Sequence, residues 1–176
     1  LVGYTNAGKS TLFNKLTNAA VLAKDLLFAT LDPTMRQIAL PHGRKIILSD
    51  TVGFISDLPT SLIAAFRATL EEVVEADVIL HVRDVSHAET EAQAADVGRV
   101  LEELGLSEDR RGAMIEVWNK SDLLDDESLQ SRRAQAARKE EIVLVSALTG
   151  DGLPRLLERI EQVLGADERI FEVRVE

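Results

Sequence analysis

The stretch Gly3-Tyr4-Thr5-Asn6-Ala7-Gly8-Lys9-Ser10-Thr11 decides the fold of this 176-residue chain. It fits the pattern G-x-x-x-x-G-K-[ST], in which glycines let the backbone curl so that its N–H groups point inward at a polyphosphate. Lys9 would bring a positive charge to the β- and γ-phosphates, and the Ser10 hydroxyl would bind a magnesium ion. The residues Thr11 to Leu16 can open a helix whose N-terminal dipole favours the same anion. The sequence therefore predicts a phosphate-binding loop between a strand and a helix.

Composition limits the class of protein. The length suits one domain, and a hydrophobic content of 45% is typical of a packed core. A net charge of −10 argues against a free-standing, non-specific nucleic-acid binder but allows docking at one place on a ribonucleoprotein. There is no cysteine, so disulfides and thiolate metal sites are excluded. No apolar run approaches the roughly 18 residues of a membrane span, and none is expected.

The two ends of the chain predict that it continues beyond them. Only Leu1 and Val2 precede Gly3, whereas the first glycine of such a loop normally follows a full buried strand. We therefore expect residues 1–165 to form one nucleotide-binding domain with a truncated first strand. Residues 166–176 end in an alternating pattern that predicts a strand. This tail would either pair with the core sheet or begin a C-terminal domain.

A long irregular segment follows the first predicted helix. The chain from about Thr17 to Met35 has no convincing periodicity, and loops of this length are usually functional or mobile. The segment contains Phe28-Ala29-Thr30-Leu31-Asp32-Pro33-Thr34. A P-loop nucleotidase needs a threonine that reaches magnesium and the γ-phosphate in one state and releases them in the other. Thr30 and Thr34 both qualify by residue type, and capping of a turn beside Pro33 is the alternative for each.

The second motif is Asp50-Thr51-Val52-Gly53. Strands are expected at Gln37–Leu40 and Lys45–Ser49, with a hairpin turn between them, so the second strand delivers the motif to the edge of a sheet. There the carboxylate could hold a magnesium-bound water, and the N–H of the glycine could reach the γ-phosphate. Phe54 follows, where some GTPases carry a glutamine that orients the attacking water. Phenylalanine cannot do this, so slow unaided hydrolysis is expected.

The third motif, Asn119-Lys120-Ser121-Asp122, follows an expected strand. The carboxylate of Asp122 can accept hydrogen bonds from both N1–H and the N2 amine of guanine, and adenine offers no such pair. Asn119 would bond the far side of the ring, and the aliphatic stem of Lys120 would cover one face. A helix cap in an ordinary loop is the alternative for Asp122. The motif therefore predicts selection of guanine, with loss of the bidentate partner costing several powers of ten in discrimination.

The fourth motif is the pair Ser146-Ala147, whose backbone N–H groups could reach the O6 atom of the base. Strands that alternate with helices, apart from one hairpin, predict an α/β fold: a mostly parallel sheet with one antiparallel hairpin strand, in three layers with helices on both faces. All four motifs then lie at the carboxyl edge of the sheet, where open α/β sheets bind ligands.

His81 is expected in the core or at an edge. The remaining expected strands are Asp77–Val82, Ala113–Trp118 and Ile142–Val145, and the expected helices are Thr60–Ala76, Ala88–Leu104, Ser128–Lys139 and residues 153–163.

Over nearly the whole chain these motifs resemble the Ras-like P-loop GTPase fold, and more closely the HflX family. The resemblance rests on Gly-Tyr-Thr-Asn-Ala-Gly-Lys-Ser from Gly3, Phe-Ala-Thr-Leu-Asp-Pro-Thr from Phe28 and Asp-Thr-Val-Gly-Phe-Ile from Asp50. Ser121 departs from the expected apolar residue without casting doubt on the rest. The resemblance implies that Ser10 and Thr30 are the Mg²⁺ ligands, with Asp50 acting through water. The residues expected to be catalytic are Lys9, Thr30 and Gly53, and those expected to bind GTP or GDP are Gly3, Tyr4, Thr5, Asn6, Ala7, Gly8, Lys9, Ser10, Thr11, Phe28, Ala29, Thr30, Leu31, Asp32, Asp50, Thr51, Val52, Gly53, Asn119, Lys120, Asp122, Ser146 and Ala147.

The resemblance also implies a biological setting. A member of this family would be a cytoplasmic, ribosome-associated GTPase that engages the large ribosomal subunit and helps to separate the subunits under stress. A monomer is expected. The part of the family that precedes this domain is missing from the chain, so ribosome contact could depend on regions outside it.

Asn6 suggests a second cation. In related GTPases an asparagine at this position helps to hold a potassium ion beside the phosphates, where it could stabilise charge on the β–γ bridge. We therefore hypothesise that hydrolysis depends on K⁺ or on a large partner. An asparagine that only stabilises the loop is the alternative.

Two other functions compete with a GTP-hydrolysing switch. A binding module that senses GTP against GDP with little turnover is favoured by Phe54 and by the apparent absence of a base within the chain. An ATPase or nucleotide kinase is disfavoured by the residues from Asn119 to Asp122.

Overall fold

The computed structural model describes residues 1–18, 34–51, 53, 73, 75–103, 105–106 and 114–165. The helix expected over Thr60–Ala76 therefore lies outside the described residues except at its end, where Val73 and Glu75 are helical. The strand expected within residues 166–176 also lies outside them. Among the helices that are described, none is both long enough and apolar enough to cross a membrane.

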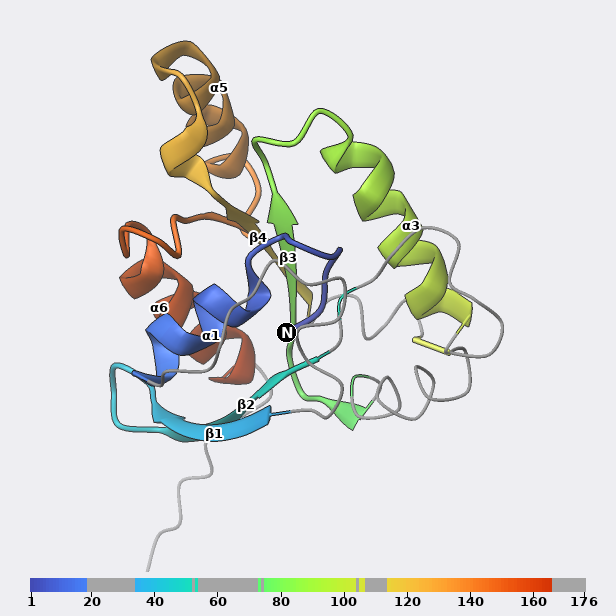
Figure 1. Ribbon diagram of the computed structural model, residues 1–176. Helices are drawn as coiled ribbons and strands as arrows, with labels where there is room; N and C mark the ends of the chain where they lie inside the picture. The colour runs from blue at the N-terminus through green and yellow to red at the C-terminus, as the bar shows by residue number, and fades with distance from the viewer. Residues whose placement is uncertain are drawn as a thin grey trace, which may run out of the picture.

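A parallel three-stranded sheet forms the centre of the molecule (Figure 1). It consists of β3 (Ile79–Asp84), β4 (Met114–Asn119) and β5 (Ile142–Leu144), in that order. The apolar runs that predicted these strands are buried on both faces, as is usual for parallel sheets. In the register of the first two strands, Asp84 lies beside Asn119. Both strands thus end on a polar residue at the carboxyl edge.

An antiparallel pair lies beside this sheet. It is formed by β1 (Thr34–Ala39) and β2 (Lys45–Asp50), which are joined by a tight turn. Residues 1–3 run between the pair and the parallel sheet. The Leu1 amino group donates to the carbonyl of Ser49 at 2.6 Å, and Val2 exchanges backbone hydrogen bonds with β3. The beginning of the chain therefore joins the two sheets and places the P-loop at the edge where β2, β3 and β4 end.

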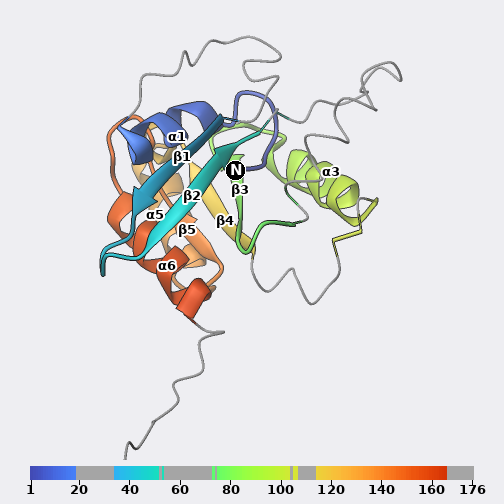
Figure 2. The ribbon, with the colours of Figure 1, turned by 90° about the horizontal axis from the view of Figure 1, so that it is seen from below.

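Helices cover the sheet on both faces (Figures 1 and 2). The helices α1 (Lys9–Thr17) and α6 (Leu153–Gly165) pack Phe13 and Leu156 into one apolar cluster with β3, β4 and β5. On the opposite face, α3 (Thr90–Glu103) packs against β3. The helix α5 (Asp126–Ala136) joins this second face through Trp118. The expected α/β class, with helices on both faces of a mostly parallel sheet and one antiparallel hairpin, is confirmed.

Some observed boundaries differ from the expected ones: β1 starts at Thr34 rather than Gln37, and α5 ends at Ala136 rather than Lys139. The strands β3 and β4 extend to Asp84 and Asn119, beyond the last apolar residue of each run. The helix expected from Ser128 starts at Asp126, because the side chain of Asp125 accepts a hydrogen bond from the Ser128 N–H at 2.8 Å and caps the first turn. The short 3₁₀ helix Ser121–Leu123 was not expected.

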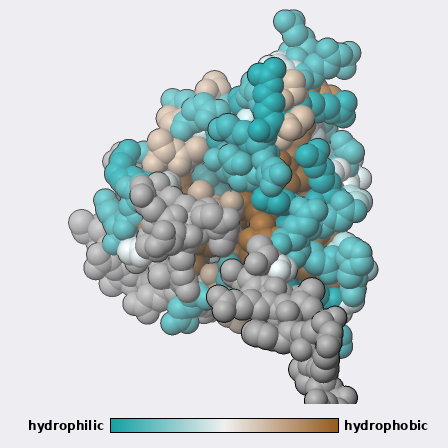
Figure 3. Space-filling model, turned by 180° about the vertical axis from the view of Figure 1, so that it is seen from behind, coloured by the Kyte–Doolittle hydropathy of each residue, from teal (hydrophilic) through white to brown (hydrophobic). Residues whose placement is uncertain are grey.

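The buried His81 lies in the middle of β3, in agreement with the expectation of a core histidine. Burial is the main cause of its low pKa of about 4, with Glu116 opposing the shift. Seen from behind, the described surface is mostly hydrophilic (Figure 3), as expected for a chain with a net charge of −10.

Candidate nucleotide-binding site

The P-loop leads from the first residues of the chain into α1 and makes a tight approach to β4. Gly8 immediately precedes the helix with a φ angle of 95°, a left-handed conformation that favours glycine. A Cβ atom built on Gly8 would lie 2.2 Å from the side-chain nitrogen of Asn119. Only glycine therefore lets the loop pack this closely on the strand end that carries the third motif.

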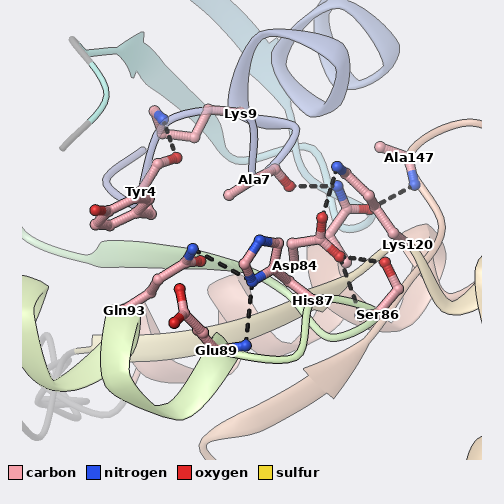
Figure 4. A network of polar contacts seen from close by, with 11 residues as sticks. Tyr4, Ala7, Lys9, Asp84, Ser86, His87, Glu89, Gln93, Lys120 and Ala147 are labelled. Atoms are coloured by element: carbon pink, nitrogen blue, oxygen red, sulfur yellow. Dashed lines mark hydrogen bonds and ion pairs between the residues drawn. The ribbon is translucent and has the colours of Figure 1, made fainter. Parts of the chain in front are cut away.

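Lys9 is buried at the base of the loop, with an exposed fraction of 6%. Its ammonium group donates to the carbonyl oxygens of Gly3 at 3.0 Å and of Tyr4 at 2.9 Å, and Figure 4 shows the second of these bonds. Burial lowers the pKa of Lys9 to about 8, against the opposing effect of the Asp50 carboxylate. An ammonium group has three N–H donors, so the bonds of Lys9 to described residues leave one donor for a phosphate oxygen.

Ser10 and Asp50 bring two oxygen groups together. The Ser10 hydroxyl donates to Asp50 at 2.8 Å, and the carboxylate is fully buried at the end of β2. Hydroxyl and carboxylate oxygens suit Mg²⁺, which is usually held by one or two such groups together with phosphates and water. The residues present therefore fit this ion. Thr30, the other expected ligand, lies outside the described residues.

Gly53 and Thr51 place the second motif against the P-loop and the first residues of the chain. A Cβ atom on Gly53 would lie 2.9 Å from the Thr5 hydroxyl oxygen and 3.0 Å from the Lys9 ammonium nitrogen. The Thr51 hydroxyl donates to the carbonyl of Leu1 at 2.6 Å. The structure thus gives Thr51 an anchoring contact in addition to its expected place in the nucleotide site.

Asn119 joins three of the four motifs. Its side chain is buried, donates to the carbonyl of Ala7 in the P-loop at 2.9 Å, and accepts from the N–H of Ala147 at 2.9 Å. These partners are 112 and 28 residues away along the chain. The sequence predicted a contact between Asn119 and the base. The structure adds a positioning role, since one amide fixes the P-loop and the fourth motif relative to each other.

The backbone donors of the fourth motif have acceptors within the protein. The N–H of Ala147 donates to Asn119, and the N–H of Ser146 donates to the carbonyl of Asp151 at 3.0 Å. Buried N–H groups need such partners when they are not exposed to water. The expected donation from these groups to the O6 atom of the base would require the bonds to be exchanged or shared, and it stays a prediction.

Asp122 lies on the surface beside this loop. One of its carboxylate oxygens accepts a hydrogen bond from the buried Ser146 hydroxyl at 2.5 Å. The bond holds the third and fourth motifs together through their side chains. A carboxylate fixed in this way on an open rim has the chemistry needed to bind the N1–H and N2 edge of guanine.

Sequence reasoning missed Asp84, which belongs to the same group of residues. The Lys120 ammonium donates to Asp84 at 2.7 Å (Figure 4). Burial of Asp84 favours its neutral form, but hydrogen bonds from Lys120 and Ser86 prevail and hold its pKa below the usual value. The expected strand stopped at Val82. Extending it to the next acidic residue would have placed a carboxylate beside the end of the following strand.

Several expected site residues lie outside the described part of the chain, and others are described away from the contacts above. Thr34 opens β1 beside Asp50, so it is a strand residue there. Asn6 is exposed, with a φ angle of 63°. Within the described residues there is no group of three or more His, Cys, Asp and Glu side chains that could hold a metal ion. The expected site residues outside the described part are Phe28, Ala29, Thr30, Leu31, Asp32 and Val52, and Phe54 also lies outside it.

Comparison with known proteins supports a GTPase domain. Residues 1–120 match the family model described as 50S ribosome-binding GTPase. The GTPase HflX of Magnetococcus marinus is 52% identical over 98% of this chain and 39% of its own length. The GTPase HflX of Escherichia coli is 44% identical over 95% of this chain and 38% of its own length. The chain thus spans well under half of these relatives.

Solved structures show the same fold. A GTP-binding protein from Sulfolobus solfataricus in complex with GDP matches with a TM-score of 0.71 and 28% identity, over 94% of this chain and 51% of that one. Era in complex with MgGDPNP and a fragment of 16S ribosomal RNA matches with a TM-score of 0.72 and 26% identity, over 97% of this chain and 57% of that one.

Proposed function

Since this chain belongs to the 50S ribosome-binding GTPase family and is a G domain of the HflX type, we propose that the protein binds GTP with Mg²⁺, hydrolyses it and acts at the ribosome. One observation carries the proposal. Asn119 ties the P-loop to the fourth motif at the carboxyl edge of the sheet. These two bonds support the proposal, because they bring the residues proposed to bind phosphate close to those proposed to bind guanine.

Different residues would bind the phosphates, the magnesium ion and the guanine base. Lys9 and the N–H groups of the P-loop would hold the β- and γ-phosphates, with the N-terminal end of α1 directed at the same charge. Ser10, together with Thr30 outside the described residues, would bind Mg²⁺ directly, and Asp50 would bind it through water; the ion would neutralise charge on the β- and γ-phosphates. Asp122 would select guanine, while the stem of Lys120 covers one face of the base.

Hydrolysis is proposed to need help from outside these residues. Phe54 follows Gly53 in the sequence, so a glutamine cannot orient the water from that position. We assign this help to a ribosomal partner or to K⁺ held near Asn6. The left-handed conformation of Asn6 is also common for asparagine in loops, so a purely structural role remains the competing explanation. Equal turnover in potassium and sodium buffers would rule out the role of K⁺.

The partner is proposed from the family and its relatives. The family model, described as 50S ribosome-binding GTPase, and the similarity to Era, solved with a fragment of 16S ribosomal RNA, support an association with the ribosome. We assign the large subunit as the partner, subunit separation under stress as the outcome, the cytoplasm as the location and a monomer as the working form. A second candidate, a GTP-sensing module with little turnover, is favoured by Phe54 and by the apparent absence of a base within the chain.

The test is GTP turnover by the full chain with purified large ribosomal subunits added or withheld. A strong acceleration by large subunits, with no effect of small subunits, would support a ribosome-activated GTPase. Tight GTP binding with no turnover under either condition would favour the sensing module instead. No binding of GTP at all would contradict both.

A further inference from the structure

We propose that Asp84 is a positioning residue for the guanine base, acting through Lys120. The inference rests on the proposed function, because it concerns how the same site would hold GTP. Asp84 lies outside all four sequence motifs, at the end of the neighbouring strand β3.

The ion pair between the two residues is short and shielded. The Lys120 ammonium lies 2.7 Å from Asp84, and the two side chains are 30% and 13% exposed. A charge-assisted hydrogen bond with this degree of shielding is stronger than an ion pair in open water. Lys120 also has a left-handed backbone, with a φ angle of 67°, which is uncommon for a residue with a long side chain. The pair therefore secures a backbone conformation that lysine does not favour by itself.

Asp84 is in turn held by the loop that leads to α3. Its second carboxylate oxygen accepts from the N–H of Ser86 at 3.0 Å and from the Ser86 hydroxyl at 2.5 Å. Next in the loop, the Nδ1 atom of His87 accepts from the N–H of Glu89 at 3.1 Å (Figure 4). The carboxylate is thus aimed at Lys120 by a turn with its own hydrogen bonds.

The stem of Lys120 passes beside the P-loop. Its Cε atom lies 3.9 Å from the position of a Cβ atom built on Gly8. Figure 4 shows Lys120 and Asp84 together near Ala7 of the P-loop. A lysine tied down at its ammonium group loses less rotamer entropy when a base packs on its methylene groups. Asp84 would therefore prepare an apolar surface for the purine before the nucleotide arrives.

The test uses Asp84→Asn and Ser86→Ala in the full chain. The first removes the charge that holds Lys120, and the second removes only the hydroxyl that orients Asp84. Asp96→Asn is the matched control, because it breaks an exposed ion pair with Arg99 of 2.9 Å on α3. For each protein we would measure the dissociation constant of GDP by calorimetry and the inhibition constant of inorganic tripolyphosphate against fluorescent GDP. Tripolyphosphate probes the phosphate end without a base.

We expect Asp84→Asn to weaken GDP binding by about tenfold and Ser86→Ala to weaken it by about threefold. Neither variant should change the affinity for tripolyphosphate, and the control Asp96→Asn should not change the affinity for GDP. A fold defect would lower the fraction of binding-competent protein rather than the affinity of the part that binds. Unchanged GDP affinity in both variants would overturn the inference, as would equal weakening of GDP and tripolyphosphate. Failure of the unmodified protein to bind GDP would instead contradict the proposed function.

Discussion

The two ends of the candidate site are built differently. At the phosphate end, Lys9 is buried and donates to main-chain carbonyls of its own loop. At the base end, the contacts join side chains from distant segments, such as Asp122 with Ser146 and Lys120 with Asp84. The phosphate end therefore depends on the path of the backbone around Lys9, together with the side-chain bond between Ser10 and Asp50. The base end depends on the identity of a few side chains, so its preference should be changeable without altering the fold.

Asn119 is the connection between the two ends, since it bonds to the P-loop on one side and to Ala147 on the other. If the comparison is right, substitutions at the base end should change which nucleotide binds. Substitutions at the phosphate end should lower the affinity for every ligand that carries a polyphosphate. A substitution of Asn119 should have both effects.

The largest effect is expected at the base end. Asp122→Asn should lower the affinity for GTP by about a thousandfold. It should raise the affinity for xanthosine triphosphate, whose C2 carbonyl can accept a hydrogen bond from the amide. The amide oxygen can still accept from the Ser146 hydroxyl, so the loop should keep its shape. Competition assays with both nucleotides would measure the switch, and the exposed Asp126→Asn on α5 serves as the control. Unchanged affinity for guanine would show that the base assignment is wrong.

A smaller but broader effect is expected from Lys9→Ala. The loss of a buried charge at the phosphates should lower the affinity for GTP by about a hundredfold and the affinity for inorganic tripolyphosphate by a similar factor. Calorimetry with both ligands would test this. If tripolyphosphate affinity survived while GTP affinity fell, the division between the two ends would not hold.

Asn119→Ala should affect both ends and the fold. Loss of its two buried hydrogen bonds should lower the free energy of unfolding by about 2 kcal/mol. The affinity for tripolyphosphate should fall by about tenfold, because the P-loop loses its anchor, and the affinity for GTP should fall further, because the base end also loses Asn119. Urea denaturation gives the first quantity and competition assays give the second. An effect confined to guanine would mean that Asn119 contacts the base without positioning the loop.

The mildest test is the pH dependence of binding. The pKa of Lys9 is about 8 in the ligand-free protein, mainly because of burial, and phosphate should raise it. The affinity for GTP should therefore fall above pH 8 by at most about tenfold per pH unit, since binding then takes up a proton at Lys9. The stability of the ligand-free protein should change in the opposite direction. Between pH 8 and the ordinary lysine pKa of 10.5, the unfolded chain holds the extra proton, so the unfolding free energy rises with pH. Lys9→Ala should show neither trend.

The sequence alone determined the parts of this protein whose chemistry is local. The P-loop, Asp50 at a strand end and the residues from Asn119 to Asp122 could all be recognised from short patterns, because each pattern combines a backbone requirement with a reactive side chain. The alternation of strands and helices then predicted the layered sheet, since hydrophobic periodicity is a property of neighbouring residues.

Only the tertiary structure decided how these parts meet. Asp84 faces Lys120 from 36 residues away, and Asn119 bonds to Ala7 from 112 residues away. It also decided that the N–H groups of Ser146 and Ala147 have protein acceptors, and that residues 1–3 join the two sheets. Neither kind of contact leaves a periodic signal along the chain. A hydrogen bond between distant residues depends on strand register and helix placement, which the packing of the whole core sets.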